Sequence, residues 1–167
     1  MGLELSGRPF LWVVRSDILD GQMESVRYLD GFLDRVASRG KMVSYVPQEK
    51  VLSHPSAACF LTHCGWNSTL EGLSYGVRFL CWPYLADQFY IQNYICDVLE
   101  VGLSLQIEDS SGVLSRHEIV QPLKKLISNT RLKENAEKIK AMAQKSVSQG
   151  GTSYWNLRYF VKQLKNC

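Results

Sequence analysis

The sequence predicts an α/β fold in which a Rossmann-like, doubly wound sheet of parallel strands is covered by helices. Five short apolar runs recur along the chain, and most are continuous rather than alternating, as in strands buried on both faces of a parallel sheet. The segments between them carry apolar residues three and four positions apart, which is the spacing of a helix with one buried face. Strands and helices that alternate in this way are typical of a doubly wound sheet.

Each apolar run is expected to form one strand. The five runs cover residues 10–14, 42–46, 57–61, 79–82 and 101–107. Helical spacing between the strands is clearest over residues 26–36 and 91–98, so we expect these segments to cover the sheet.

The last third of the chain, residues 115–167, is expected to consist of helices. Ser115 and Glu118 have the spacing of a capping box, which predicts the start of the first helix. Apolar stripes predict a second helix over residues 132–147 and a third over 157–164, with a pair of glycines between them.

The composition is that of a single globular domain. Of the 167 residues, 46% are hydrophobic and 21% are charged, and the net charge is +3. A small and dispersed charge argues against a nucleic-acid partner. No apolar run reaches the ~18 residues that a membrane-spanning helix needs, so we expect no stable membrane anchor. Five cysteines without a CxxC pair argue against a disulfide framework, and they favour a reducing compartment such as the cytoplasm.

The segment that carries chemistry is the end of the third predicted strand and the start of the next helix. The strand runs into His63, Gly65 follows, and Asn67 and Ser68 lead into the helix. The first amides of a helix are unpaired and the helix dipole is positive there, so this arrangement predicts an anion site. Gly65 would let the backbone approach a ligand closely, and His63 can donate a hydrogen bond to a phosphate oxygen.

Ordinary structural roles stay open for the same residues. Asn67 or Ser68 can simply cap the helix, and Ser68 with Glu71 has the spacing of a capping box. His63 can be a hydrogen-bonded core histidine, and Trp66 can serve packing alone. The sequence has no G-x-S-x-G turn, no G-x-G-x-x-G and no P-loop, and its Cys and His residues lack zinc spacing, so those sites are not expected.

The flanks of this segment add a longer pattern. It begins at Tyr45-Val46-Pro47-Gln48, contains H-C-G-W-N-S from His63 onward, and ends at Asp87-Gln88. This ordered set, residues 45–88, resembles the donor-binding signature box of the plant UDP-dependent glycosyltransferases. Text outside the box, such as L-W-V-V-R from Leu11, resembles the same family, so the resemblance extends over essentially the whole chain.

The resemblance implies a GT-B fold of two domains, in which the C-terminal domain holds the nucleotide sugar. Residues 1–167 would be that UDP-sugar-binding domain, truncated at its N-terminal end and lacking its first strand. In the strand order 3-2-1-4-5-6 this strand is central, so residues 10–14 and 57–61 would flank an unfilled position. We expect the sheet to close up, to borrow a strand, or to present edges that favour poor solubility and self-association.

The resemblance also implies how the nucleoside is held. Tyr45, at a position where the family usually has Trp, would stack on the uracil, and backbone groups of Val46 would bind the edge of the base. Gln48 would reach the ribose side. Glu71 would accept hydrogen bonds from both ribose hydroxyls, since its two oxygens can take two donors at once.

The resemblance implies that the other box residues bind the diphosphate and the sugar. His63, Asn67 and Ser68 would hold the diphosphate at the helix N-terminus, with Gly65 and Trp66 packed beside it. Asp87 and Gln88 would bind the sugar hydroxyls, and Gln at the last box position resembles members that use glucose. Arg78 stands where the family usually has Pro, and we interpret it as a surface substitution in a turn.

The function implied is transfer of a sugar, with glucose expected, from a UDP-sugar to a hydroxyl of a small lipophilic acceptor, with inversion. The family's catalytic histidine and its acceptor pocket lie in an N-terminal domain, so we expect no catalytic residue in this chain. UDP-glucose is a co-substrate, and no cofactor or metal is implied. Two alternatives stay open: a module that binds UDP or UDP-sugar without catalysis, and an interaction fragment that pairs with a separate N-terminal half.

Overall fold

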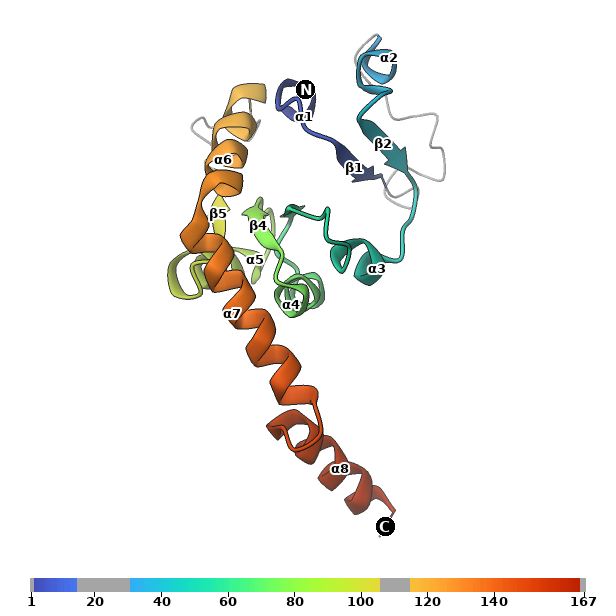
Figure 1. The fold of residues 1–167 in the computed structure, drawn as a ribbon, viewed down its shortest axis with the longest axis vertical. Helices are drawn as coiled ribbons and strands as arrows, with labels where there is room; N and C mark the ends of the chain where they lie inside the picture. The colour runs from blue at the N-terminus through green and yellow to red at the C-terminus, as the bar shows by residue number, and fades with distance from the viewer. Residues whose placement is uncertain (1, 15–30, 106–114, 166–167) are drawn as a thin grey trace.

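The fold is that of a computed structural model, which describes residues 2–14, 31–105 and 115–165 (Figure 1). Its strands are β1 (Phe10–Val13), β2 (Gly40–Val43), β3 (Cys59–Thr62), β4 (Arg78–Cys81) and β5 (Gly102–Ser104). Its helices are α1 (Gly2–Leu5), α2 (Phe32–Val36), α3 (Gln48–Leu52), α4 (Trp66–Tyr75), α5 (Gln88–Asn93), the π-helix η3 (Tyr94–Val98), α6 (Arg116–Ser128), α7 (Thr130–Val147) and α8 (Thr152–Leu164).

The strands are all parallel and form two sheets. The first sheet pairs β1 with β2, and the second has the order β3-β4-β5. The α/β class and the parallel strands are therefore confirmed, and each of the five expected strands is present within a few residues of its predicted position. One boundary matters for function: β2 ends at Val43, two residues before Tyr45, so the start of the signature box lies in a loop.

The break between the sheets lies where the sequence predicts an unfilled strand position. Among the described residues, no backbone hydrogen bond joins β1 to β3, and each of these strands pairs on one side only. Leu11 and Val13 on β1 are about two-fifths exposed, whereas all of β4 is buried. The sheet has therefore not closed up, and α1 packs against α6 beside the break, where a Cβ on Gly2 would lie 2.7 Å from that of Ile119.

The hydrophobic core is built on the two faces of β4. Phe79 and Cys81 point to one face and Leu80 to the other, as the alternation along a strand requires. The first face packs against α5, η3 and α7 through Ile91, Ile95 and Ala136. The second packs against α6 and the start of α7 through Leu123, Leu126 and Leu132. This central strand therefore fixes the loops at both of its ends.

Arg78, the first residue of β4, is buried, and its interpretation as a surface substitution in a turn is wrong. Its Nη1 donates to the carbonyl oxygens of Leu126 and Ile127 at 2.8 and 2.9 Å. These carbonyls belong to the last turn of α6, where the helix itself supplies no N–H donors for them. A cation at this end is also favoured by the helix dipole. The guanidinium therefore joins β4 to the end of α6.

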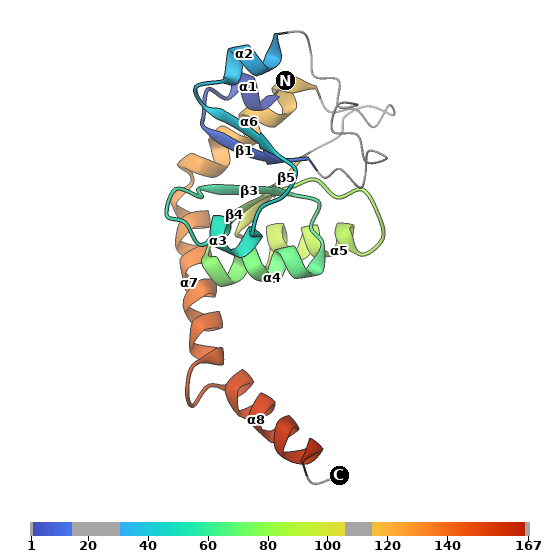
Figure 2. The ribbon, with the colours of Figure 1, turned by 90° about the vertical axis from the view of Figure 1, so that its right-hand side faces the viewer.

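The C-terminal helices form as predicted. Glu118 N donates to Ser115 Oγ at 3.4 Å and the Glu118 carboxylate accepts from Ser115 N, which confirms the capping box. Asn129 caps α7 through its side-chain oxygen. Figure 2 shows α8 extending from the end of α7 away from the sheets, and none of its described residues is buried. Within the described residues, no helix is both long and apolar enough to cross a membrane.

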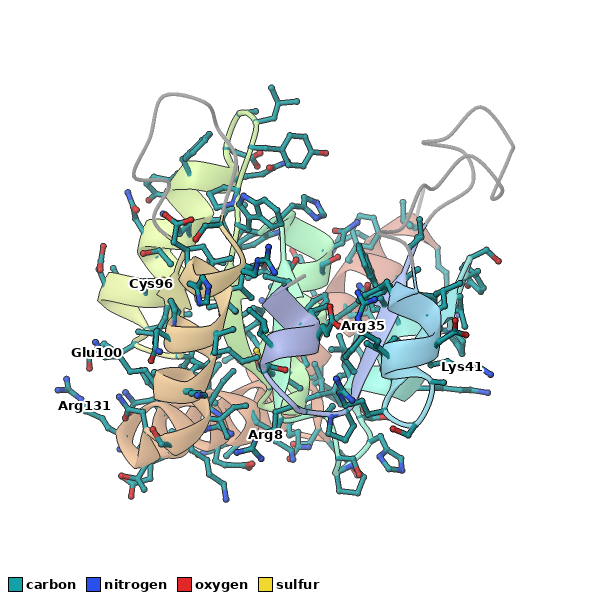
Figure 3. The ribbon with its side chains drawn as sticks, turned by 90° about the horizontal axis from the view of Figure 1, so that it is seen from above. Arg8, Arg35, Lys41, Cys96, Glu100 and Arg131 are labelled. Carbon is teal, nitrogen blue, oxygen red and sulfur yellow. The ribbon has the colours of Figure 1, made fainter. Side chains whose placement is uncertain are left out.

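Two ion pairs at the surface join different elements, and Figure 3 labels Arg35 of the first pair and both residues of the second, Glu100 and Arg131. Arg35 on α2 binds Glu4 on α1, and this hydrogen bond lowers the pKa of the Glu4 carboxyl from 4.5 to about 2. Arg131 on α7 binds Glu100, which precedes β5. Parts of two predicted elements, residues 26–30 and 106–107, lie outside the described residues.

Candidate functional site

Three loops carry the predicted site, and each follows the carboxyl end of a strand. The loop after β2 leads through Tyr45 into α3, the loop after β3 leads through His63 into α4, and the loop after β4 leads through Tyr84 into α5. Because the strands are parallel, these loops lie at the same edge of the fold, where open α/β sheets bind ligands.

The imidazole of His63 lies directly over Gly65. A Cβ added to Gly65 would lie 2.4 Å from His63 Nε2, which is far inside the contact distance of real side chains. The sequence predicts that Gly65 lets a ligand approach the backbone. In the structure, the space that a side chain at position 65 would need is occupied by the imidazole of His63. The ring of Tyr84 contacts the same imidazole, with centroids 6.0 Å apart.

Helix α4 begins without a side-chain cap. Gly65 is the N-cap residue, and no side chain accepts a hydrogen bond from the first turn. The alternatives in which Asn67 or Ser68 is the cap, or Ser68 and Glu71 form a capping box, are therefore wrong, because both residues lie inside the first turn. The amides at this end stay available, and the positive end of the helix dipole lies beside His63. This is the chemistry of an anion site.

A hydrogen-bonded group joins α3 to α4. Gln48 Nε2 donates to Ser68 Oγ at 3.0 Å and to Glu71 Oε2 at 2.8 Å. The sequence analysis expects all three residues to bind the sugar-nucleotide ligand, but it does not predict that they bind one another. The bond from Gln48 orients the Glu71 carboxylate through Oε2. Within the described part of the chain no hydrogen bond reaches Oε1, so this oxygen can accept from a ligand without displacing Gln48.

The first box residues lie apart from this group. Tyr45 is 80% exposed in the loop between β2 and α3, and Val46 beside it is half-buried. Trp66, the first residue of α4, is 55% exposed, so it is not a core residue. The exposed phenol ring of Tyr45 has a face available for stacking on a planar base.

The last box residues order the loop between β4 and α5. Gln88 Oε1 accepts hydrogen bonds from the backbone N–H groups of Tyr84 and Leu85 at 3.0 and 3.1 Å. The oxygen of Gln88 is thus used within the loop, and its amide nitrogen is the part left for a ligand. Asp87 is exposed and its side chain does not cap α5, although it occupies the N-cap position, so its carboxylate is free to accept hydrogen bonds from hydroxyl groups.

Two of these loops contain a non-glycine residue in the left-handed region. Cys64, after His63, has φ 67°, and Ala86, before Asp87, has φ 54°. Side chains disfavour this conformation, and residues held in it are concentrated at ligand sites. Cys64 is fully buried, which explains how the structure retains this backbone next to His63.

Three thiols, those of Cys64, Cys81 and Cys96, belong to one cluster of the hydrophobic core, and Cys64 directly follows His63. Cys81 Sγ lies 4.0 Å from Cys96 Sγ, and Cys96 is labelled in Figure 3. Hydrogen bonds with the Cys64 and Cys96 thiols, together with burial, raise the pKa of Cys81 far above its usual range, whereas the hydrogen bond with Cys81 lowers the pKa of Cys64. Over the described ranges, no three His, Cys, Asp or Glu side chains are grouped so that they could hold a metal ion.

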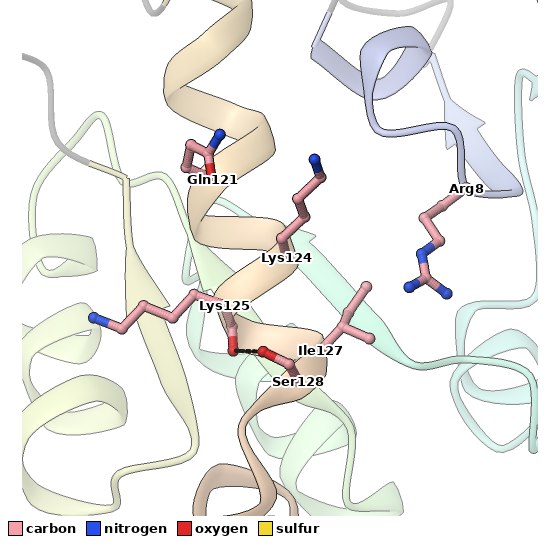
Figure 4. Close-up of a pocket in the computed structure, with 6 residues that line it drawn as sticks. All are labelled: Arg8, Gln121, Lys124, Lys125, Ile127 and Ser128. Carbon is pink, nitrogen blue, oxygen red and sulfur yellow. Dashed lines mark hydrogen bonds between the residues drawn. The ribbon is translucent and has the colours of Figure 1, made fainter.

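A separate cavity of about 580 Å³ lies near the amino ends of the strands (Figure 4). It opens between Arg8, just before β1, and the last turns of α6, where Lys124 and Ile127 line it. None of the predicted site residues lines this cavity. The lysines there have an ordinary explanation, because cations are favoured near a helix C-terminus. The cavity is therefore not an alternative location for the predicted site.

The chain matches one sequence family over residues 2–146, that of UDP-glucoronosyl and UDP-glucosyl transferase. It is 42% identical to limonoid UDP-glucosyltransferase of Citrus unshiu, over 96% of this chain and 32% of that protein. It is 41% identical to UDP-glycosyltransferase 83A1 of Arabidopsis thaliana, over 99% of this chain and 33% of that protein. The chain therefore spans about a third of the length of these relatives.

Solved structures give the same result. The fold is similar to that of Os79 from O. sativa in complex with UDP, with a TM-score of 0.87 and 34% identity over 97% of this chain and 35% of that one. It is also similar to a UDP-glucose: anthocyanidin 3-O-glucosyltransferase in complex with UDP, with a TM-score of 0.83 and 32% identity over 99% of this chain and 36% of the other.

Proposed function

Since the chain belongs to the UDP-glucoronosyl and UDP-glucosyl transferase family, we propose that residues 1–167 form a UDP-sugar-binding domain of GT-B type, with UDP-glucose as the donor. The observation that carries the proposal is the uncapped N-terminus of α4 with the His63 imidazole over Gly65. Relatives of known structure were determined with UDP, and named relatives are glucosyltransferases, which supports the choice of ligand.

In this proposal the nucleoside binds across the α3–α4 group. The ring of Tyr45 stacks on the uracil, and backbone groups of Val46 bind the edge of the base. Glu71 accepts from the ribose hydroxyls, with Gln48 holding its carboxylate in place through the 2.8 Å hydrogen bond. Gln48 thus acts on the ribose through Glu71 rather than by direct contact alone.

The diphosphate binds at the start of α4 and the sugar lies toward the α5 loop. His63 and the first-turn amides donate to phosphate oxygens, assisted by the side chains of Asn67 and Ser68. Asp87 and the amide nitrogen of Gln88 bind sugar hydroxyls. These groups stabilise the negative charge that develops on the departing UDP, and this role requires neither a metal nor a further cofactor.

The whole protein is proposed to transfer the sugar to a hydroxyl of a small lipophilic acceptor with inversion. We propose that the acceptor site and the general base belong to an N-terminal domain, as the family resemblance implies. Of the described histidines, only His63 lies in one of the three site loops. His54 follows α3 and accepts a hydrogen bond from Ser56 N, and His117 lies on the first turn of α6. The alternatives, a non-catalytic UDP-binding module and an interaction fragment, share the same donor site.

Titration of the 167-residue chain with UDP by calorimetry tests the donor site. Hydrogen bonds to a charged group contribute ~1.5–3 kcal/mol, so Glu71→Ala should weaken UDP binding about tenfold or more. Glu71→Gln, which can still accept from Gln48, should also bind more weakly because it lacks the charge. The control is Glu134→Ala on the exposed face of α7, and equal affinities for all four proteins would remove Glu71 from the site.

Assays of sugar transfer separate the alternatives. We expect no transfer by this chain alone and transfer when a separately produced N-terminal domain of a relative is added. Binding of UDP without transfer under either condition would favour the non-catalytic module. Turnover of a phenolic acceptor by the chain alone would show that a base among His54, His117 or Asp87 had been overlooked.

We also propose that the edges of β1 and β3 promote self-association, since within the described ranges each strand pairs with a neighbour on one side only. Light scattering on the purified chain tests this, and a monodisperse monomer would contradict it. A reducing compartment such as the cytoplasm suits the four described cysteines, which are all free thiols.

A further inference from the structure

Tyr84 has no part in the function proposed above, yet its ring contacts the imidazole of that site. The centroids of the Tyr84 and His63 rings are 6.0 Å apart, and the two planes are tilted by 44°. Tyr84 is 71% exposed, so hydrophobic burial does not explain its position. The residue lies in the loop between β4 and α5, whereas His63 lies after β3, so the contact joins two of the three site loops.

The backbone of Tyr84 is held in place. Its N–H donates to Gln88 Oε1 at 3.0 Å, and the N–H of Leu85 donates to the same oxygen at 3.1 Å. Ala86, two residues after Tyr84, has φ 54°, which shows that the turn is kept in a disfavoured conformation. The loop therefore fixes the backbone position from which the Tyr84 ring reaches His63.

A second contact of the His63 imidazole is with Gly65. An added Cβ there would lie 2.4 Å from Nε2 and 3.1 Å from Cε1, so the imidazole lies as close to the backbone as glycine allows. The Gly65 backbone and the Tyr84 ring both contact the imidazole, and together they restrict its rotation. A donor whose direction is fixed before the ligand arrives loses less conformational entropy when it binds.

We propose that Tyr84 is a positioning residue for His63, whose ring keeps the imidazole over Gly65 so that it can donate to a diphosphate oxygen at the start of α4. This inference rests on the proposed function, because it concerns the same diphosphate site. The contact requires the aromatic ring and not the hydroxyl group. Tyr84→Phe should therefore retain the effect and Tyr84→Ala should lose it.

The test is a double-mutant cycle measured by titration of the 167-residue chain with UDP. Tyr84→Ala should weaken UDP binding about three- to tenfold, as expected for an aromatic contact, and Tyr84→Phe should bind as the unchanged chain does. In a His63→Ala background, Tyr84→Ala should have no further effect. Tyr90→Ala, at an exposed tyrosine on α5 without a ring contact among the described residues, is the matched control.

Several results would overturn the inference. One is unchanged affinity for Tyr84→Ala while the unchanged chain binds UDP. Another is an equal loss with and without His63, because the ring would then act on the ligand directly. Absence of UDP binding by the unchanged chain would instead refute the proposed function.

In that last case, NMR of the ligand-free chain can still test whether Tyr84 contacts His63, through the imidazole resonances. Ring-current shifts of His63 should change in Tyr84→Ala and remain in Tyr90→Ala. Unchanged His63 resonances in Tyr84→Ala would contradict the positioning role.

Discussion

Replacing Arg78 by methionine removes the guanidinium that joins β4 to α6 while keeping a long apolar side chain. Two carbonyl oxygens of the last turn of α6, those of Leu126 and Ile127, then lose a charged donor at 2.8 and 2.9 Å. Hydrogen bonds to charged groups contribute ~1.5–3 kcal/mol each, and a cation at a helix C-terminus adds ~0.3–1 kcal/mol.

The net effect is smaller than the sum. Burial of the guanidinium has its own desolvation cost, which the methionine side chain avoids, and Ile127 is only partly buried, so water can replace one donor. We expect a loss of ~2–4 kcal/mol in the free energy of unfolding, out of a typical ~5–15 kcal/mol. Arg78→Lys should lose less, because an ammonium keeps the charge but lacks the planar fork that serves both carbonyls.

Urea unfolding followed by circular dichroism measures this loss. With a slope of ~2 kcal/mol per molar urea, the midpoint should fall by roughly 1–2 M. The control is Arg131→Met, which removes an exposed ion pair with Glu100 and should cost less than ~1 kcal/mol. Equal midpoints for Arg78→Met and Arg131→Met would refute the argument that the buried guanidinium stabilises the end of α6.

Three further predictions rest on single contacts. Gly65→Ala should weaken UDP binding about tenfold, because the new Cβ would lie 2.4 Å from His63 Nε2 and would force the imidazole to move. Calorimetry would show the weaker binding, without a comparable change in melting temperature. Ser115→Ala should lower the unfolding free energy by ~1 kcal/mol through loss of the α6 cap, measured against Ser74→Ala in the last turn of α4, where the serine caps no helix N-terminus. Because the Arg35 hydrogen bond lowers the pKa of Glu4 from 4.5 to about 2, its contribution to stability is complete above pH 4.5 and is lost as the pH falls toward 2. Glu4→Gln should flatten that part of the acid-unfolding curve.

The alternation of apolar runs and helical segments was enough to predict the parallel α/β class. Strand ends were less predictable, because apolarity continues into loops that are half-buried for other reasons. Val46 extends the second run, although the strand ends at Val43 and the chain turns toward α3. An apolar run therefore shows where a strand begins to be buried but not where its backbone pairing stops.

Contacts between distant positions could not be predicted from one sequence. Arg78 follows a Gly-Val turn and resembles a surface residue locally, but its acceptors lie 48 and 49 residues away. The bonds from Gln48 to Ser68 and Glu71 span 20 and 23 residues, so the motif identifies the residues without showing that they bind one another. Tyr84 was missed for the same reason, since an aromatic residue in a loop has no local pattern that indicates its partner.

The division of the strands into two sheets bears on how a nucleotide would act on the fold. Tyr45 follows β2 of one sheet, whereas His63 and Glu71 follow β3 of the other, so a bound uridine diphosphate would be held by both at once. It would link the β1-β2 sheet to the β3-β4-β5 sheet, which share no strand pairing among the described residues. A ligand that binds only the native arrangement adds ~2.7 kcal/mol to stability at a hundredfold excess over its dissociation constant. The uracil base or pyrophosphate alone would engage one sheet each, and would leave the spacing between the two sheets unconstrained.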